Sequence, residues 1–320
     1  TMSIFTSSKV LGFENDELLG PTGAVAIPEF NTRFTRGMLV DTQPKDFNTL
    51  VRLSGFSHGT DVWLGNARDL IVSGTASVLE TVGCRDDIML YLIHMGLDPK
   101  MSFKIMEAVR KGKVKKGFED GWEEAMREHQ VPDWYIGSLA KIGYLFPKAH
   151  AVAYVMMAFR IAWFKVHEPL AFYATFFTVR AKAFDAEYCC AGIDAVKRKI
   201  REIENNKDAT AVEQNLMVTL EVCYEFYLRG FHFDTINIYE SQATAFKITD
   251  NGLLPPFISV RGLGETAAQD TVEKRKGKTF ISVEEFSTCC SKLSKTHIEQ
   301  LKALGAFAGM ADTSQITLFG

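Results

Sequence analysis

The sequence predicts a mainly α-helical protein, in which a larger helical domain precedes a small α-rich domain with a short β segment. Two observations lead to this prediction. Apolar residues recur at helical spacing in one segment after another, and the first two thirds of the chain show no alternation of strands and helices. With 320 residues, of which 47% are hydrophobic, the chain is long enough for two domains with cores of their own.

The first two thirds of the chain predict a series of helices after a poorly structured start. Residues 1–35 mix turn signals with short apolar runs and predict mostly loop. Asp46 is a plausible N-cap, residues 54–60 predict a loop, and Glu168-Pro169 breaks a long apolar helix. The predicted helices cover residues 46–53, 61–71, 85–94, 101–110, 132–142, 149–166, 169–177 and 186–205.

A candidate domain boundary follows at Asn206-Lys207-Asp208. Beyond it we expect a helix, a β-like segment from Gly230 to Tyr239, a loop, and then short helices with tight turns as far as Phe307. The last ten residues predict a flexible tail. The expected domains are therefore residues 1–205, 206–310 and 311–320.

Charge and hydropathy exclude several classes of protein. The net charge of −3 gives no global basic field, so any contact with nucleic acid has to come from local patches. The apolar stretch at 149–166 is interrupted by Arg160 and Lys165, and we expect a buried core helix rather than a membrane span. The first residues show no signal peptide. These features predict a cytoplasmic protein without a membrane partner.

The cysteines predict no metal site. None of the six forms a Cys-x-x-Cys pair, and two adjacent Cys-Cys pairs are poorly spaced for zinc. We expect reduced and mostly buried thiols, as in cytosolic proteins. They are Cys84, Cys189, Cys190, Cys223, Cys289 and Cys290.

The segment from Phe146 to Tyr154 opens the long apolar helix with a basic turn. Helix N-termini carry unpaired N–H groups and partial positive charge, so Lys148 and His150 lie where a phosphate would be stabilised. His150, Tyr154 and Met157 share one helix face, and an aromatic ring there could stack on a base. The alternative is a core histidine and tyrosine with structural partners only.

Two further patterns could contact a phosphate or could be plain surface. The run from Arg110 to Lys116 is dense in positive charge, and it could equally be a solvated helix end. The sequence Ser57-His58-Gly59-Thr60 could be an ordinary turn. Acidic pairs such as Asp86-Asp87 point about 100° apart on a helix, so we expect no shared metal between them.

The stretch from Val260 to Ala268 resembles the hairpin of a helix-hairpin-helix motif. Two glycines bracket one apolar residue, which permits a tight turn and close approach to a phosphate, and the next helix start offers its amides. An ordinary helix–helix turn is the alternative. Four cations just after it favour DNA: Lys274, Arg275, Lys276 and Lys278. A second, weaker hairpin is expected from Lys302 to Phe307.

Taken together, these segments resemble the C-terminal part of the PolC-type DNA polymerase III alpha subunits, which are family C polymerases of Gram-positive bacteria. The resemblance covers essentially the whole chain. Its longest motifs lie at 27–30, 53–67, 83–89, 104–113, 146–154 and 261–264. The end of the chain, Gln315, Ile316, Thr317, Leu318 and Phe319, resembles the family's clamp-binding tail, which suits docking into a preformed groove.

The resemblance implies polymerase fingers, a duplex-binding region and a tail for the β sliding clamp. It also implies primer–template DNA and an incoming dNTP as partners, with Mg²⁺ held by palm aspartates that have no counterpart in this chain. We therefore expect a fragment that is inactive alone. The implied nucleotide-binding residues are Arg110, Lys111, Lys113, Lys148 and His150, with Ser57, His58 and Tyr154 beside the nascent base pair and Phe146 beneath it. The implied duplex contacts are Arg261, Gly262, Leu263, Gly264, Glu265, Thr266 and the four cations that follow.

Two other functions remain open. The chain could be a non-catalytic DNA-binding module in which residues 1–205 are scaffold, or a structural subunit tethered to the clamp. Loss of nucleotide binding on replacing Arg110 or Lys148 would separate the polymerase interpretation from the module, which has no nucleotide binding to lose. Deletion of residues 315–319 would remove the only partner of a tethered subunit.

Overall fold

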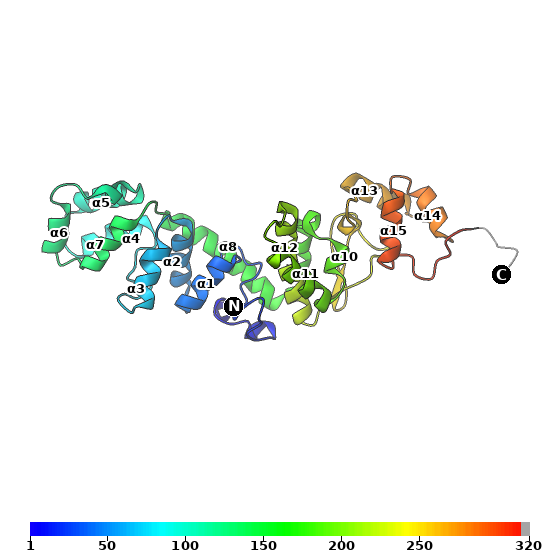
Figure 1. Cartoon of the computed structure of the whole chain (residues 1–320), viewed down its shortest axis with the longest axis horizontal. Helices are drawn as coiled ribbons and strands as arrows, with labels where there is room; N and C mark the ends of the chain where they lie inside the picture. The colour runs from blue at the N-terminus through cyan, green and yellow to red at the C-terminus, as the bar shows by residue number, and fades with distance from the viewer. Residues whose placement is uncertain (315–320) are drawn as a thin grey trace. The chain divides into compact units, whose positions relative to one another are not determined.

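The protein is mainly helical in the computed structural model, which describes residues 1–314 (Figure 1). This confirms the predicted fold class. By internal contacts the chain divides into two compact units, Thr1–Trp163 and Phe164–Gly320. The predicted domain limits at residues 205 and 310 stay predictions.

The first unit begins with short 3-10 turns, as expected for a region with little regular structure, although Ile4 and Phe5 are fully buried there. Helices then follow one another through short loops, and α4 and α5 pack against each other. The elements are η1 (Met2–Phe5), η2 (Lys9–Leu11), α1 (Arg33–Thr42), α2 (Phe47–His58), η3 (Trp63–Ala67), α3 (Arg68–Val72), α4 (Arg85–His94), α5 (Pro99–Arg110), η4 (Lys113–Lys116), α6 (Trp122–Glu128), α7 (Asp133–Lys141) and α8 (Lys148–His167).

The loop predicted at residues 54–60 is wrong over most of its length, because α2 continues to His58. Asp46 is its N-cap as predicted, and its carboxylate accepts a hydrogen bond from the Thr49 N–H at 2.8 Å. Gly55 does not mark a turn. A Cβ at this position would lie 2.2 Å from the Gly83 carbonyl oxygen, so the glycine lets the backbone at Gly83 pack closely against α2.

The helix predicted over residues 61–71 is also wrong in its first half. Only α3 is regular, and the preceding turn η3 has non-helical backbone at Leu64, Gly65 and Asn66. The buried Asn66 amide accounts for the distortion, since it donates to the carbonyls of Asp61 at 3.0 Å and Ser138 at 3.1 Å. A side chain that bonds to backbone groups in this way competes with regular helix.

Helix α8 is not core on most of its faces, which corrects the prediction. Small residues form one buried stripe, Ala151, Val155, Ala158 and Ala162. Larger apolar side chains point outward instead, with Tyr154 49% exposed and Met157 53% exposed. By length and composition alone α8 could cross a membrane, which is weak evidence since soluble helices also pass that test.

The second unit pairs α11 with α12 and adds a small sheet (Figure 1). The helix predicted over 186–205 is two helices, because Gly192 has a positive φ of 91° between them. The elements are α9 (Pro169–Val179), η5 (Ala181–Ala183), α10 (Ala186–Cys189), α11 (Ile193–Asn205), α12 (Ala211–Leu228), β1 (His232–Phe233), β2 (Lys247–Ile248), β3 (Gly252–Leu254), η6 (Phe257–Ser259), α13 (Glu265–Lys274), α14 (Val283–Cys289) and α15 (Lys295–Ala303).

The sheet has the order β1-β3-β2, with β1 parallel and β2 antiparallel to β3. Only β1 lies inside the predicted β-like segment. The core beside it is rich in aromatic rings, and Phe177 contacts Phe226, Phe233 and Phe246 with centroids 5.3 to 5.9 Å apart. Such ring contacts add to the free energy gained by burying the rings.

The second unit also holds a fully buried ion pair. Lys165 Nζ lies 2.7 Å from Glu225 Oε1, and both side chains are 0% exposed. Tyr173 donates a hydrogen bond to the same carboxylate at 2.7 Å. Buried charges persist only when they are paired and hydrogen-bonded in this way.

The cysteines are free thiols, and four of the six are buried. Burial raises the pKa of the Cys84 thiol to about 12, with a further contribution from the nearby Asp87 carboxylate. Burial also raises the pKa of Cys223. The expectation of mostly buried thiols is confirmed, and their reduced state stays a prediction.

Candidate nucleotide and nucleic-acid interfaces

The site in the first unit is organised by one extended segment, residues 143–146, which we call the crossing segment. It bonds to three separate elements. Thr60 N–H donates to Tyr144 O at 2.9 Å, Leu145 N–H donates to Arg110 O at 3.3 Å, and Arg85 N–H donates to Phe146 O at 3.2 Å. The end of α2, the start of α4, the end of α5 and the start of α8 therefore meet here.

Two glycines allow this meeting. Gly112 has a φ of +68°, a conformation that side chains rarely adopt, and a Cβ on it would lie 2.5 Å from the Gly143 carbonyl oxygen. A Cβ on Gly143 would lie 3.1 Å from Asp61 Oδ2 and 3.2 Å from Lys115 Nζ. The basic run predicted at 110–116 is thus packed directly on the crossing segment rather than being a loose helix end.

Four rings form a continuous row beside the crossing segment, which we call the ring row: His58, Phe146, His150 and Tyr154. His58 stacks on Phe146 at 4.9 Å between centroids, Phe146 meets His150 edge-on at 4.8 Å, and His150 stacks on Tyr154 at 4.5 Å. His150 and Tyr154 are exposed. The alternative that they are a core pair is therefore excluded, and the exposed part of this stacked pair is accessible to a base.

Glu29 holds the first ring of the row in place. Its Oε2 lies 3.3 Å from His58 Nε2 and accepts a hydrogen bond from Ser54 Oγ at 3.1 Å. His58 Nδ1 lies 2.9 Å from the Ser54 carbonyl oxygen, so both ring nitrogens face acceptors. Ser57 Oγ donates to the same carbonyl at 3.0 Å. These contacts hold the orientation of the His58 ring.

The cations at the end of α5 share one carboxylate. Arg110 donates through both Nε and Nη2 to Glu107, the latter at 2.9 Å, and Lys111 Nζ lies 2.9 Å from Glu107 Oε2. The hydrogen bonds from Arg110 and Lys111 lower the pKa of Glu107 to about 2. Glu107 is therefore ionised at neutral pH and orients both cations while it neutralises part of their charge.

The start of α8 already has an anionic partner. Asp86 Oδ2 accepts a hydrogen bond from the Lys148 N–H at 2.9 Å, and Lys148 Nζ lies 3.4 Å from Asp87 Oδ1. Asp87 also accepts from Cys84 N–H at 2.9 Å and pairs with Arg52 at 3.2 Å. A phosphate bound at the N-terminus of α8 would therefore lie beside the Asp86 carboxylate, which already accepts from the Lys148 N–H.

The nine predicted nucleotide-binding residues thus lie on elements that meet at the crossing segment. Among residues 1–314, Lys113 is exposed and forms no ion pair. Sequence reasoning missed the acidic partners Glu29, Asp86 and Glu107. Glu107 could have been found, since it precedes Arg110 and Lys111 by three and four residues on one helix. Glu29 could not, because its contact with α2 depends on the tertiary fold.

The carboxylates of this site do not fit a catalytic magnesium pair. The oxygens of Asp87 are occupied by Arg52, Lys148 and two backbone N–H groups. Asp86 caps α8. Within the described part of the chain, no group of three or more histidine, cysteine or acidic side chains could hold a metal ion.

The hairpin in the second unit connects η6 to α13. Gly262 has a φ of +77°, and Leu263 N–H donates to Val260 O at 3.1 Å to close the turn. Val260 and Leu263 are buried, which anchors the base of the hairpin. Gly264 is the N-cap of α13 and lacks a capping side chain. The first amides of α13 are therefore presented without a carboxylate cap, as a backbone phosphate site requires.

The cations around this hairpin are mostly engaged within the protein. Arg275 Nη1 donates to Ile238 O at 2.8 Å and lies 5.4 Å from the Phe257 ring centroid, and burial lowers the pKa of its guanidinium. Lys274 pairs with Asp270 at 3.5 Å, Lys276 with Glu273 at 2.5 Å, and Lys278 donates to Cys289 Sγ at 3.0 Å. The last three remain at the surface and could exchange partners.

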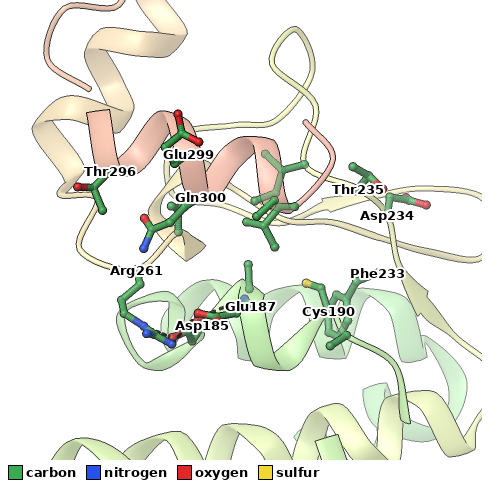
Figure 2. A pocket seen from close by; sticks show the side chains of 16 residues that line it. Asp185, Glu187, Cys190, Phe233, Asp234, Thr235, Arg261, Thr296, Glu299 and Gln300 are labelled. Carbon is green, nitrogen blue, oxygen red and sulfur yellow. Dashed lines mark hydrogen bonds and ion pairs between the residues drawn. The ribbon is translucent and has the colours of Figure 1, made fainter. Parts of the chain in front are cut away.

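Arg261 is held by the start of α10. Its Nε lies 2.7 Å from Asp185 Oδ2 and its Nη2 lies 2.9 Å from Glu187 Oε2. The hydrogen bond to Asp185 raises the pKa of the Arg261 guanidinium. Figure 2 shows these contacts at one side of a cavity of about 540 Å³ between α10, the hairpin and α15.

The weaker hairpin predicted from Lys302 to Phe307 ends a helix instead. Gly305 has a φ of +83°, and Ala306 N–H donates to Leu301 O at 2.9 Å, which closes the C-terminus of α15. In residues 304–314 no further helix follows. The predicted clamp-binding residues, Gln315 to Phe319, lie outside the described residues.

Comparisons with known proteins agree with these two regions. Residues 1–130 match the family model "Bacterial DNA polymerase III alpha subunit finger domain", and residues 230–315 match the model "Helix-hairpin-helix motif". The chain is 51% identical over 320 residues to a DNA polymerase III PolC-type from Caldanaerobacter subterraneus. It is 49% identical over 319 residues to the protein of that name from Halalkalibacterium halodurans and 48% identical over 324 residues to that from Streptococcus pneumoniae.

These relatives are much longer proteins. The alignments cover 99% to 100% of this chain but only 22% to 23% of each relative. The match to the finger model includes α1 to α5 and the basic run after it, whereas the match to the helix-hairpin-helix model includes the hairpin at 260–264.

Proposed function

Because the chain is the fingers and helix-hairpin-helix region of a PolC-type DNA polymerase III alpha subunit, we propose that it holds the incoming dNTP and the primer–template duplex in the complete enzyme. The observation that carries this proposal is the convergence of the ring row and the cations on the crossing segment. A base can stack on the exposed rings while cations a few residues away hold its phosphates.

The triphosphate would be bound by exchange of partners. Arg110 and Lys111 would turn from Glu107 toward the phosphate oxygens, Lys148 would turn from Asp87, and Lys113 would be recruited from solvent. His150 would contribute from the first turn of α8. Ser57, His58 and Tyr154 would line the base pair, with Phe146 beneath it. Such prepositioned charges stabilise a bound polyphosphate without large rearrangement of the backbone.

The duplex would be held by backbone amides. The amides of Gly262, Leu263 and Gly264 and of the first turn of α13, with Glu265 and Thr266, would approach a phosphate. Lys274, Lys276 and Lys278 would add charge along the backbone. We infer that Mg²⁺ acts in the complete polymerase and is held by carboxylates outside this chain, so the chain alone should extend no primer. A primer-extension assay on the isolated chain would contradict this if it gave product.

The nucleotide site can be tested with Arg110→Ala and Lys148→Ala. Each should weaken dGTP binding about tenfold, because each removes a charge-assisted hydrogen bond. Lys104→Ala is the matched control, since Lys104 is an exposed cation on α5 without an ion pair among the described residues. Isothermal titration calorimetry would measure the nucleotide affinity, and duplex binding by the same variants should be unchanged.

The alternative function predicts a different result. A non-catalytic DNA-binding module would bind duplex normally and would show no dGTP affinity in the parent chain. That outcome would refute the nucleotide site and leave the hairpin as the functional part.

We further propose that Gln315 to Phe319 dock on the β sliding clamp, as the Gln-x-x-Leu-Phe pattern suggests. Deletion of these five residues should abolish binding to the clamp in a pull-down with purified proteins. Retained binding would show that the contact lies elsewhere.

A further inference from the structure

Arg261 lies at the turn of the proposed DNA-binding hairpin, and its half-exposed guanidinium is engaged by acidic side chains of this chain. Figure 2 shows the side chain running from the hairpin to the start of α10, where it meets Asp185 and Glu187. Its guanidinium carbon also lies 5.1 Å from the centroid of the Tyr188 ring. Three side chains from residues 185–188 therefore contact one cation.

The partners of Arg261 are themselves held. Asp185 is only 16% exposed and is the N-cap of α10, with Oδ1 accepting from Glu187 N–H at 3.0 Å. The Tyr188 ring is also contacted by Lys199, whose Nζ lies 4.7 Å from the ring centroid. The carboxylate is thus fixed by its own helix, and a fixed carboxylate can hold an arginine in one direction.

A cavity of about 540 Å³ lies between the hairpin, α10 and α15, and Arg261 and Asp185 line it together with Gln300 of α15. From α15, His297 Nε2 lies 3.9 Å from the position that a Cβ on Gly262 would take at the tip. Buried Val260 and Leu263 fix the base of the hairpin. Arg261 lies between these two buried residues in the sequence, and its ion pairs join the turn of the hairpin to Asp185 and Glu187.

We propose that Arg261 is a positioning residue, which clamps the hairpin to Asp185 and Glu187 and so aims the hairpin amides at the duplex backbone, rather than a phosphate ligand itself. This inference rests on the proposed duplex-binding function and adds a coupling between the hairpin and α10. Asp185 and Glu187 thereby become residues on which DNA affinity depends, although both are anionic.

The two roles of Arg261 predict opposite effects of Asp185→Asn. If Arg261 binds phosphate, removing a competing carboxylate frees it, and duplex affinity rises. If Arg261 is a clamp, the same change loosens the hairpin, and duplex affinity falls by about fivefold, the scale of a partly exposed ion pair. Asparagine is as good an N-cap as aspartate, so α10 should be preserved.

The experiment measures binding of a fluorescent primer–template duplex to the full 320-residue chain at several salt concentrations. Asp185→Asn and Arg261→Gln should both lower affinity and leave the slope of log K against log salt unchanged. A phosphate ligand would instead lose about one unit of slope in Arg261→Gln. Glu187→Gln, at a more exposed partner, should lower affinity about twofold and should leave folding intact.

Glu299→Gln is the matched control. Glu299 lines the same cavity, is exposed and is directed away from Arg261 in Figure 2. Removing its charge should leave affinity unchanged or raise it slightly, because repulsion of the duplex decreases. A fall in affinity with Asp185→Asn and none with Glu299→Gln supports the clamp. A rise or no change with Asp185→Asn overturns it.

Hydrogen exchange without DNA separates failure of the clamp from failure of the proposed function. The amides at 260–267 should exchange faster in Asp185→Asn than in the parent chain. If the parent chain binds no duplex, the proposed function fails, while faster exchange still supports the clamp. Unchanged exchange overturns the clamp in either case.

Discussion

The two candidate interfaces use the same residue types in different ways. Around the crossing segment, Glu107 and Asp87 each hold two cations in partly buried positions, and an exposed row of rings lies beside them. Around the hairpin, the cations either support the fold, as Arg275 does, or form single pairs at the surface, as Lys276 does. In the proposed function the first interface would present mainly side chains to its ligand, whereas the second would present mainly backbone amides.

This difference explains why the glycines matter for different reasons. At the crossing segment a glycine is required at position 112 because the Gly143 backbone approaches it closely. Gly112 thereby holds the basic run against the crossing segment. At the hairpin a Cβ on Gly264 would meet nothing within 4 Å, so this glycine leaves space for a ligand. The missing side chain thus permits close backbone packing at Gly112 and leaves open space at Gly264.

The largest effect on stability and on nucleotide binding is expected from Gly112→Ala. Both the positive φ of 68° and the 2.5 Å approach to Gly143 O oppose a Cβ, and we expect a loss of about 3 kcal/mol of unfolding free energy together with loss of dGTP binding. Urea denaturation and calorimetry would measure the two quantities.

Gly121→Ala is the control for that variant. Gly121 also has a positive φ, of 82°, but nothing lies within 4 Å of its Cβ position. It should cost about 1 kcal/mol from backbone strain alone and leave nucleotide affinity unchanged. Equal effects of the two substitutions would show that the contact with Gly143 contributes nothing.

Features that depend on local sequence, such as helix ends and caps, could be predicted from the sequence. Helix α4 was predicted with its exact ends, the Asp46 cap is present, and the long helix does begin at the predicted basic turn. The sequence could not show that Gly55 packs on Gly83 or that Asn66 bonds to Ser138, because these contacts join residues far apart in the chain. The same limit applies to the site, whose cations were predicted and whose acidic partners were not.

An intermediate effect is expected from Arg275→Ala. Its guanidinium is partly buried, donates to Ile238 O and lies over Phe257, so its loss should cost about 1–2 kcal/mol of stability by leaving that carbonyl without its partner. Lys276→Ala is the matched control on the next residue. It should cost less than about 0.5 kcal/mol and reduce the salt slope of duplex binding by about one unit.

Equal effects of these two variants would contradict the distinction between a cation that supports the fold and one that binds the duplex. Thermal unfolding and salt-dependent duplex binding should separate a cation used for folding from one used for binding. A reduced salt slope with unchanged stability in Arg275→Ala would mean that Arg275 contacts phosphate and that the second interface also relies on presented side chains.

The smallest effect is expected from Asp86→Asn at the start of α8. Asparagine can still accept the hydrogen bond from Lys148 N–H, so the helix cap is retained and stability should change by less than about 0.5 kcal/mol. The negative charge beside the proposed triphosphate is removed, and dGTP should bind about threefold more tightly because Asp86 no longer repels it.

Asp120→Asn provides the control, because Asp120 is an exposed acid in the turn before α6 and forms no ion pair among the residues that the structure describes. It removes the same formal charge and should leave dGTP affinity unchanged. Weaker binding in Asp86→Asn would mean that the carboxylate orients Lys148 for the nucleotide rather than competing with it. Asp86 would then act on Lys148 as Asp185 is proposed to act on Arg261, and both interfaces would depend on an acid that positions a cation.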